Sequence, residues 1–224
     1  MRRVTIVVLT LILLALSVLP ALAHQPFFED EDITAEKPWF VAKPTVSTAI
    51  YATLDSRTDV DYYSFDGKKG QTILLSIVIP QIAGQESFAP TMALMGPSLG
   101  SASLPTKVVK PDDTGVYLLP ALTGPAKTFY EPFGRKSYWE RQEERVTLPA
   151  DGRYTVAVWS DDAQVGRYTF VIGDREIPGG DPAYGRKMAA YWTPVPAPAP
   201  EPVRAAPAIA PTKLSGCGEE FRTW

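Results

Sequence analysis

Apolar and polar residues alternate with a period of two along several short segments between residues 46 and 173. This alternation is typical of β-strands with one buried face, and no segment carries a sustained helical period. The clearest strands are predicted at residues 46–54, 59–66, 71–79, 154–159 and 166–173, and weaker strands at 91–95, 107–110, 115–119 and 138–148. Short strands separated by Gly, Pro and Asp predict an all-β fold, an antiparallel β-sandwich or jelly roll.

Two short connections predict β-hairpins. Residues 67–70 join the second and third of the clear strands, and residues 160–163 join the last two. Turns this short usually connect strands that are neighbours in one sheet. The strand at 71–79 is unusual because Leu74 and Val78 make its second face apolar as well. We therefore expect this strand to be covered on both sides.

The beginning of the chain has the features of a secretory signal peptide. Two arginines precede an almost unbroken apolar run over residues 4–19, and small side chains follow at Ala21 and Ala23. Cleavage after Ala23 would remove residues 1–23 and make His24 the new amino terminus. The protein is therefore expected to be exported to the periplasm, the cell surface or the medium. If the signal were not cleaved, it would serve as an N-terminal membrane anchor.

The end of the chain has a different composition. Residues 193–224 are rich in proline and alanine and poor in large apolar side chains, which predicts a disordered tail after a single β-sandwich domain at 24–192. No apolar run follows Trp192, so a C-terminal membrane helix is not expected. The single cysteine, Cys217, lies in this tail, and one cysteine excludes an intramolecular disulfide.

Charge excludes one class of partner. The chain has 22 basic and 25 acidic residues, a formal net charge of −3, and its basic residues are scattered along the sequence. Proteins that bind nucleic acid gather basic residues on one surface, so no nucleic-acid partner is expected.

We also expect the protein to be a monomer.

Two segments together resemble a known family. Residues 59–80, DVDYYSFDGKKGQTILLSIVIP, combine an Asp-x-Asp-Tyr-Tyr-x-Phe strand, a glycine turn and an apolar strand, and residues 148–173 contain a Gly-x-Tyr-x-Val-x-Val strand. This pair resembles the bacterial pre-peptidase C-terminal domain, a small secreted β-sandwich. The matching positions are Asp59, Asp61, Tyr62, Tyr63, Phe65, Gly152, Tyr154, Val156 and Val158.

The departures from that family also carry information. The chain has a long insertion between the two segments, an acidic aromatic start (PFFEDED, residues 26–32) and an additional piece at residues 171–192. These features resemble a subgroup of exported bacterial proteins in which such a sandwich stands alone. The resemblance implies a non-catalytic accessory or binding role outside the cytoplasm.

The inventory of reactive side chains argues against an enzyme. His24 is the only histidine and stands at the predicted mature terminus, and Cys217 lies in the tail. Serine or cysteine proteases need a histidine held within the fold. Two carboxylates from distant loops could still cleave a glycosidic bond, although no local motif indicates them. We therefore predict no enzymatic activity.

Two metal sites are conceivable. An N-terminal His24 could bind copper through its amine and imidazole, with carboxylates from residues 29–32 completing the set, although carboxylates suit calcium better. Asp59 and Asp61, at the start of a strand, could hold a structural calcium ion. The alternatives are a solvated terminus for His24 and ordinary turn chemistry for the aspartates.

Aromatic residues in the segment 128–146 indicate a possible ligand surface. Tyr130, Phe133, Tyr138 and Trp139 stand among charged side chains, a composition that polysaccharide-binding sandwiches use for stacking on sugar rings. The alternative is that these rings pack in the core. The sequence thus predicts an exported, non-catalytic binding module whose partner is a polysaccharide or an envelope protein.

Overall fold

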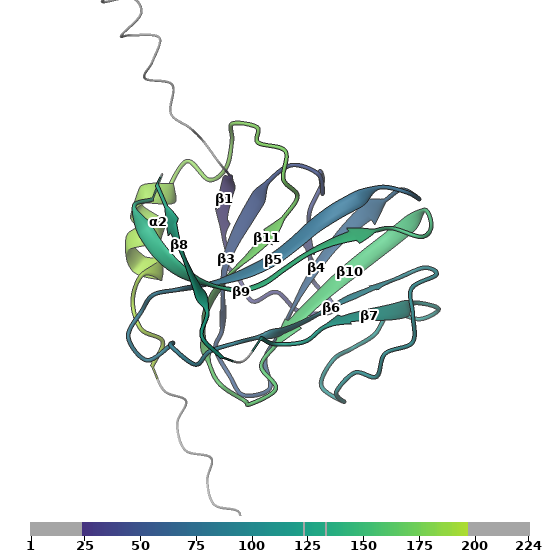
Figure 1. The fold of residues 1–224 in the computed structure, drawn as a ribbon, viewed down its shortest axis with the longest axis horizontal. Helices are drawn as coiled ribbons and strands as arrows, with labels where there is room; N and C mark the ends of the chain where they lie inside the picture. Colours follow the sequence, from purple (N-terminus) through teal and green to yellow (C-terminus); the bar gives the residue numbers. More distant parts are fainter. Residues whose placement is uncertain (1–23, 123, 133, 197–224) are drawn as a thin grey trace, which may run out of the picture.

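A computed structural model describes residues 24–122, 124–132 and 134–196, and the predictions for residues 1–23 and for most of the Pro/Ala-rich tail lie outside this part of the chain. The described chain forms two β-sheets and one short helix (Figure 1). The elements are β1 (Gln25–Phe28), β2 (Trp39–Phe40), β3 (Thr48–Leu54), β4 (Val60–Gly67), β5 (Thr72–Pro80), β6 (Thr91–Gly96), β7 (Gly115–Leu119), β8 (Lys127–Glu131), β9 (Lys136–Thr147), β10 (Gly152–Trp159), β11 (Gly166–Ile172) and α2 (Tyr184–Tyr191).

The two sheets pack face to face as a β-sandwich, which confirms the predicted fold class. A six-stranded sheet has the order β1-β3-β11-β5-β9-β8, and a five-stranded sheet has the order β2-β4-β10-β6-β7. Most neighbours are antiparallel, but β1 runs parallel to β3 and β2 runs parallel to β4. The N-terminal segment therefore contributes one edge strand to each sheet.

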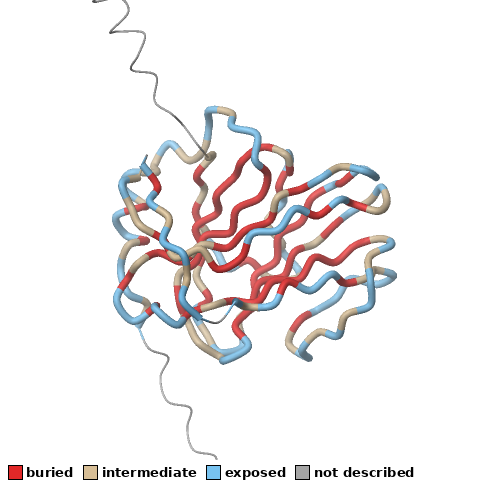
Figure 2. Tube along the Cα trace, viewed as in Figure 1, coloured by how far each residue is buried: buried red, intermediate tan, exposed pale blue. Residues whose placement is uncertain are grey.

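The core lies between the sheets, where alternate residues of every central strand meet. Figure 2 shows buried positions concentrated along the central strands and exposed positions in the loops. Tyr63 of β4 stacks on Phe170 of β11 with ring centroids 4.4 Å apart, and both side chains are fully buried. The period of two that predicted the strands therefore also identifies the face that each strand buries.

The structure shows that both predicted hairpins are wrong. β4 and β5 belong to different sheets, and so do β10 and β11, so each short connection crosses the sandwich. In the first connection Gly67 is still paired in β4, and the turn follows at Lys68–Gln71, where the Gln71 amide donates to the Lys68 carbonyl at 3.0 Å. A turn sequence sets how tightly the chain reverses, but packing of the apolar faces decides which sheet the next strand enters.

Other local predictions also differ from the structure. Residues 107–110 form a turn instead of a strand, because Val108 is buried over the outer face of the five-stranded sheet and the Val109 amide donates to the Tyr62 hydroxyl at 2.7 Å. The short strands β1, β2 and β8 and helix α2 were not predicted. Two to five residues give little periodicity, and an eight-residue helix depends on tertiary packing for its stability.

Helix α2 covers the outer face of the six-stranded sheet. Met188 and Tyr191 are its buried residues, and they pack with Tyr51 of β3 and Val171 of β11 in a small second core that Val78 also contacts. The outer face of β5 is therefore covered only in part: Val78 packs against this small core, and Leu74 and Val78 both remain half-buried. Among the described residues, no helix is both long and apolar enough to cross a membrane.

A β-bulge in β9 directs two polar side chains toward the loops at one end of the sandwich. Ile77 pairs with Gln142 and Val78 with Glu140, so Arg141 has no partner across the strands. A bulge of this kind bends the strand and redirects its side chains. Within the described residues, the buried Arg141 guanidinium and the buried Gln142 amide then donate to backbone carbonyls alone, those of Glu86, Phe88, Pro90, Leu119, Pro120 and Gly124. These bonds fix two long loops without any carboxylate partner.

The stacked pair between the sheets gives a test of the core. Replacing Phe170 by Ala should lower the free energy of unfolding by about 3 to 5 kcal/mol, because the change leaves a cavity beside Tyr63. Tyr130, which is 56% exposed, is the matched control, and Tyr130→Ala should cost less than about 1 kcal/mol. Urea unfolding followed by circular dichroism measures both values. Equal costs would contradict the described packing.

Candidate functional site

Three carboxylates meet where the N-terminal segment crosses from one sheet to the other. Glu29 follows β1, Asp32 lies three residues later, and Asp61 is the second residue of β4. The Glu29 amide donates to the Tyr51 carbonyl at 3.0 Å, which continues the pairing of β1 with the six-stranded sheet. The Tyr62 amide donates to the Ile33 carbonyl at 3.1 Å, which ties the same segment to the five-stranded sheet. We call Glu29, Asp32 and Asp61 the acidic cluster.

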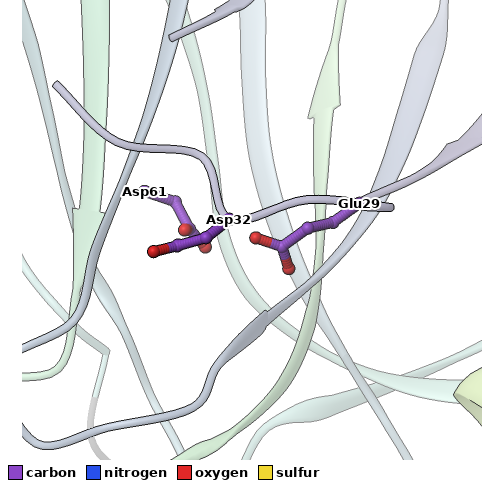
Figure 3. A group of neighbouring side chains, drawn as sticks. All are labelled: Glu29, Asp32 and Asp61. Carbon is purple, nitrogen blue, oxygen red and sulfur yellow. The ribbon is translucent and has the colours of Figure 1, made fainter. Parts of the chain in front are cut away.

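The carboxylates of the acidic cluster face one another. One oxygen from each side chain lies within 4.8 Å of the other two, and Figure 3 shows the three groups turned toward a common point. Asp61 is 0% exposed, and its Oδ1 atom has no hydrogen-bond partner in the described structure. A buried carboxylate oxygen without a partner is costly, so this atom indicates that a further group belongs at the cluster.

The other oxygen of Asp61 belongs to a hydrogen-bond chain across the core. The Tyr168 hydroxyl donates to Asp61 Oδ2 at 2.5 Å, and the Tyr63 and Tyr168 hydroxyls lie 2.7 Å apart. Tyr168 is in β11 of one sheet, and Tyr63 and Asp61 are in β4 of the other. The chain therefore links the two sheets and orients the Asp61 carboxylate, leaving Oδ1 for the cluster.

Burial and mutual repulsion disfavour the charged forms of Glu29 and Asp61. Burial, followed in importance by the charges of Glu29 and Asp59, raises the pKa of Asp61 well above its usual value. Burial also raises the pKa of Glu29 to about 7, although the Thr53 amide, which donates to its Oε2 at 2.8 Å, opposes this shift. Without a cation, the cluster would therefore hold protons at a pH where exposed acids have lost theirs.

Asp59 adjoins the acidic cluster without being one of its three closest members. Its Oδ2 accepts the Asp55 amide at 2.7 Å, which is the turn chemistry considered above. Burial and the neighbouring charges of Asp32 and Asp55 raise its pKa to about 6. Asp59 thus strengthens the negative field at the cluster.

His24 lies apart from these aspartates. Its Nδ1 forms a hydrogen bond with the Ser47 hydroxyl, and the acids that act on its pKa are Glu131 and Glu176. Burial is the larger effect and lowers the His24 pKa. The carboxylates of residues 29–32 have other partners: Glu29 and Asp32 lie with Asp61, Asp30 pairs with Lys187, and Glu31 pairs with Lys37.

The predicted aromatic surface is divided among different environments. Tyr138 and Trp139 are neighbours in β9 and point to opposite faces of the sheet, Tyr138 into the small core under α2 and Trp139 toward the main core. Tyr130 is more than half exposed on β8. Phe133 lies outside the described residues. Tyr138 and Trp139 therefore do not form a common stacking platform.

Sequence reasoning identified Asp61 but missed its partners. Glu29 and Asp32 are separated from Asp61 by about thirty positions, and they were considered only in connection with His24. The available signal was the high density of acids in residues 29–32 close to a second acidic segment at 59–61. Only the parallel pairings of β1 and β2, one in each sheet, bring the two segments together.

Comparisons with known proteins add distant structural likenesses. No known protein family and no curated protein matches the sequence. A periplasmic inhibitor of g-type lysozyme from Salmonella Typhimurium is 18% identical with a TM-score of 0.34, covering 61% of this chain and 98% of the inhibitor. The pre-peptidase C-terminal domain of a Bacillus anthracis collagenase is 15% identical with a TM-score of 0.32, covering 63% and 99%. CorA, a surface-associated copper-binding protein of Methylomicrobium album BG8, is 10% identical with a TM-score of 0.29, covering 68% and 98%. One of these is a domain of the family that the motifs resemble, but likenesses this distant leave function to be argued from the residues of this chain.

Proposed function

We propose that the protein is an exported, non-catalytic β-sandwich module that binds a calcium ion at Glu29, Asp32 and Asp61. The observation that carries the proposal is the fully buried Asp61 carboxylate, which has one oxygen without a partner and faces two other acids. The export signal at residues 1–23 and the family resemblance support a role in the cell envelope or outside the cell. The partner class that we favour is an envelope protein, because no aromatic platform for a polysaccharide is formed by Tyr138 and Trp139.

A divalent cation resolves the electrostatic conflict at the acidic cluster. Three carboxylates this close repel one another, and burial adds a desolvation cost for the charges of Glu29 and Asp61. Protons can relieve that conflict, but a proton on one oxygen does not bridge three side chains. A cation bound between them would neutralise the acids, satisfy Asp61 Oδ1 and join the two sheets through their ligands.

The donor set favours calcium over copper. All three candidate ligands offer carboxylate oxygens, which are hard donors that suit calcium. Copper prefers imidazole or sulfur, and the one histidine is engaged with Ser47 away from the cluster. Backbone carbonyls and water would complete the coordination shell.

Calcium should raise the thermal stability of the protein. At a concentration about a hundredfold above the dissociation constant, binding adds about 2.7 kcal/mol, which corresponds to a rise in Tm of about 5 to 10 °C. Differential scanning calorimetry in EDTA and in excess calcium measures this rise, and native mass spectrometry reports whether one ion is bound.

Substitutions distinguish calcium binding at the acidic cluster from a general effect of calcium on exposed acids. Asp32→Asn removes one ligand charge at an exposed position and should abolish most of the rise in Tm. Asp112→Asn, an exposed acid in the loop before β7, is the matched control and should keep the full rise. If calcium leaves the wild-type Tm unchanged, or stabilises both variants equally, the proposed site is wrong.

The raised pKa values predict how the metal-free protein responds to pH. Burial raises the pKa of Glu29 to about 7 and that of Asp59 to about 6, so the folded state keeps protons that the unfolded chain releases above about pH 4. Their contribution to stability is complete below the unfolded pKa and is lost as pH rises through 6 to 7. Urea unfolding in EDTA should therefore show stability that falls between about pH 4 and about pH 7, and Glu29→Gln should flatten the fall. An unchanged slope in that variant would show that Glu29 does not titrate as described.

A further inference from the structure

A second pocket lies on the outer face of the six-stranded sheet, near helix α2. It has a volume of about 230 Å³ and is bounded by side chains from β3, β5, β8, β9 and β11 together with His24. None of its lining residues belongs to the acidic cluster. We call it the outer-face pocket. It is smaller than the roughly 300 to 1,000 Å³ of pockets that hold drug-sized ligands, so its occupant would be small.

The outer-face pocket has an apolar floor. Ala49, Leu74, Val78 and Val171 point outward from adjacent strands, and Phe129 adds an aromatic wall. The outer face of a sheet usually carries polar residues when it meets water. Here the outward-facing residues are apolar although helix α2 does not cover all of them. An exposed apolar surface of this kind favours a ligand with an apolar body.

The charged residues of the outer-face pocket are of one sign. Its lining contains three carboxylates, Glu131, Glu140 and Glu143, and neither lysine nor arginine. Lys127 pairs with Glu140 at 3.0 Å, whereas Glu143 is exposed and no described cation lies within salt-bridge distance of it. His24 adds little positive charge, because burial lowers its pKa. The field in the pocket therefore attracts a cation.

Tyr138 closes one side of the outer-face pocket. It is 2% exposed, and its hydroxyl group is buried beside that of Tyr51. Tyr138 therefore contributes its aromatic ring to the wall, and the exposed Glu143 is the charged group that a ligand can reach.

We propose that the outer-face pocket binds a small organic ammonium ion, a primary amine attached to an apolar or aromatic body. The body would lie on Val78 and Val171 against Phe129, and the ammonium group would face Glu143. This site is independent of the calcium site, since the two share no residue, and either can fail without the other.

Matched probes test the proposal directly. Phenethylammonium, 2-phenylethanol and 3-phenylpropionate share an aromatic body and differ in charge. Titration of the purified protein in EDTA, followed by ¹H–¹⁵N NMR, should show saturable movement of the Ser76, Val78 and Val171 amide signals with phenethylammonium, with a Kd on the order of 1 mM. The alcohol should bind about fivefold more weakly, and the anion more weakly still.

Variants locate the binding. Glu143→Gln should weaken phenethylammonium about threefold to fivefold, and Glu144→Gln, a neighbouring exposed acid that does not line the pocket, should leave it unchanged. Val78→Phe should fill the floor and abolish binding, with the dispersion of its spectrum reporting that it remains folded. The proposal is overturned if the pocket amides do not move at tens of millimolar probe, if the alcohol or the anion binds as tightly as the amine, or if Glu143→Gln and Glu144→Gln behave alike.

Discussion

A carboxylate at the junction of two packed sheets is the constraint on which the acidic end of this sandwich depends. Asp61 is fully buried, and its two oxygens require partners. One oxygen is bonded by Tyr168, which in turn contacts Tyr63 and so links β11 to β4. The other faces Glu29 and Asp32, which enter from the N-terminal segment. The Asp61 side chain thus connects both sheets with the segment between β1 and β2. Its charge has to be neutralised for that arrangement to be stable.

The rest of the sandwich positions this junction. The stacked aromatic pair at the centre holds β4 against β11, so that Asp61 and Tyr168 meet at a fixed separation. At another end, the bulge in β9 turns Arg141 and Gln142 toward backbone carbonyls of two long loops. Carbonyl dipoles solvate the Arg141 guanidinium without neutralising it. These contacts therefore order the two loops without using a carboxylate of the acidic cluster. The two proposed binding sites lie on opposite sides of the six-stranded sheet. The acidic cluster is on the side that faces the other sheet, and the outer-face pocket is on the outer side.

The sequence allowed most of the strands to be predicted, because each central strand buries alternate residues and so preserves a period of two. It did not predict the connections, since a short glycine turn serves equally for a hairpin within one sheet and for a crossing between two. The predicted hairpins failed for this reason at residues 67–70 and 160–163. Helix α2 and the edge strands β1, β2 and β8 were missed because their stability comes from the surfaces that they cover, which are assembled from distant parts of the chain.

For the candidate site, the sequence by itself supplied the acidic residues, and the tertiary structure decided which of them meet. From the sequence, Asp59 and Asp61 were candidates for calcium and His24 was a candidate for copper, and nothing in the sequence chose between these sites. Which carboxylates meet depended on the parallel pairing of β1 with β3 and of β2 with β4, which brings residues 29–32 beside Asp61. Contacts between segments thirty positions apart leave no periodic trace in either segment, because periodicity records only which face of a strand is buried.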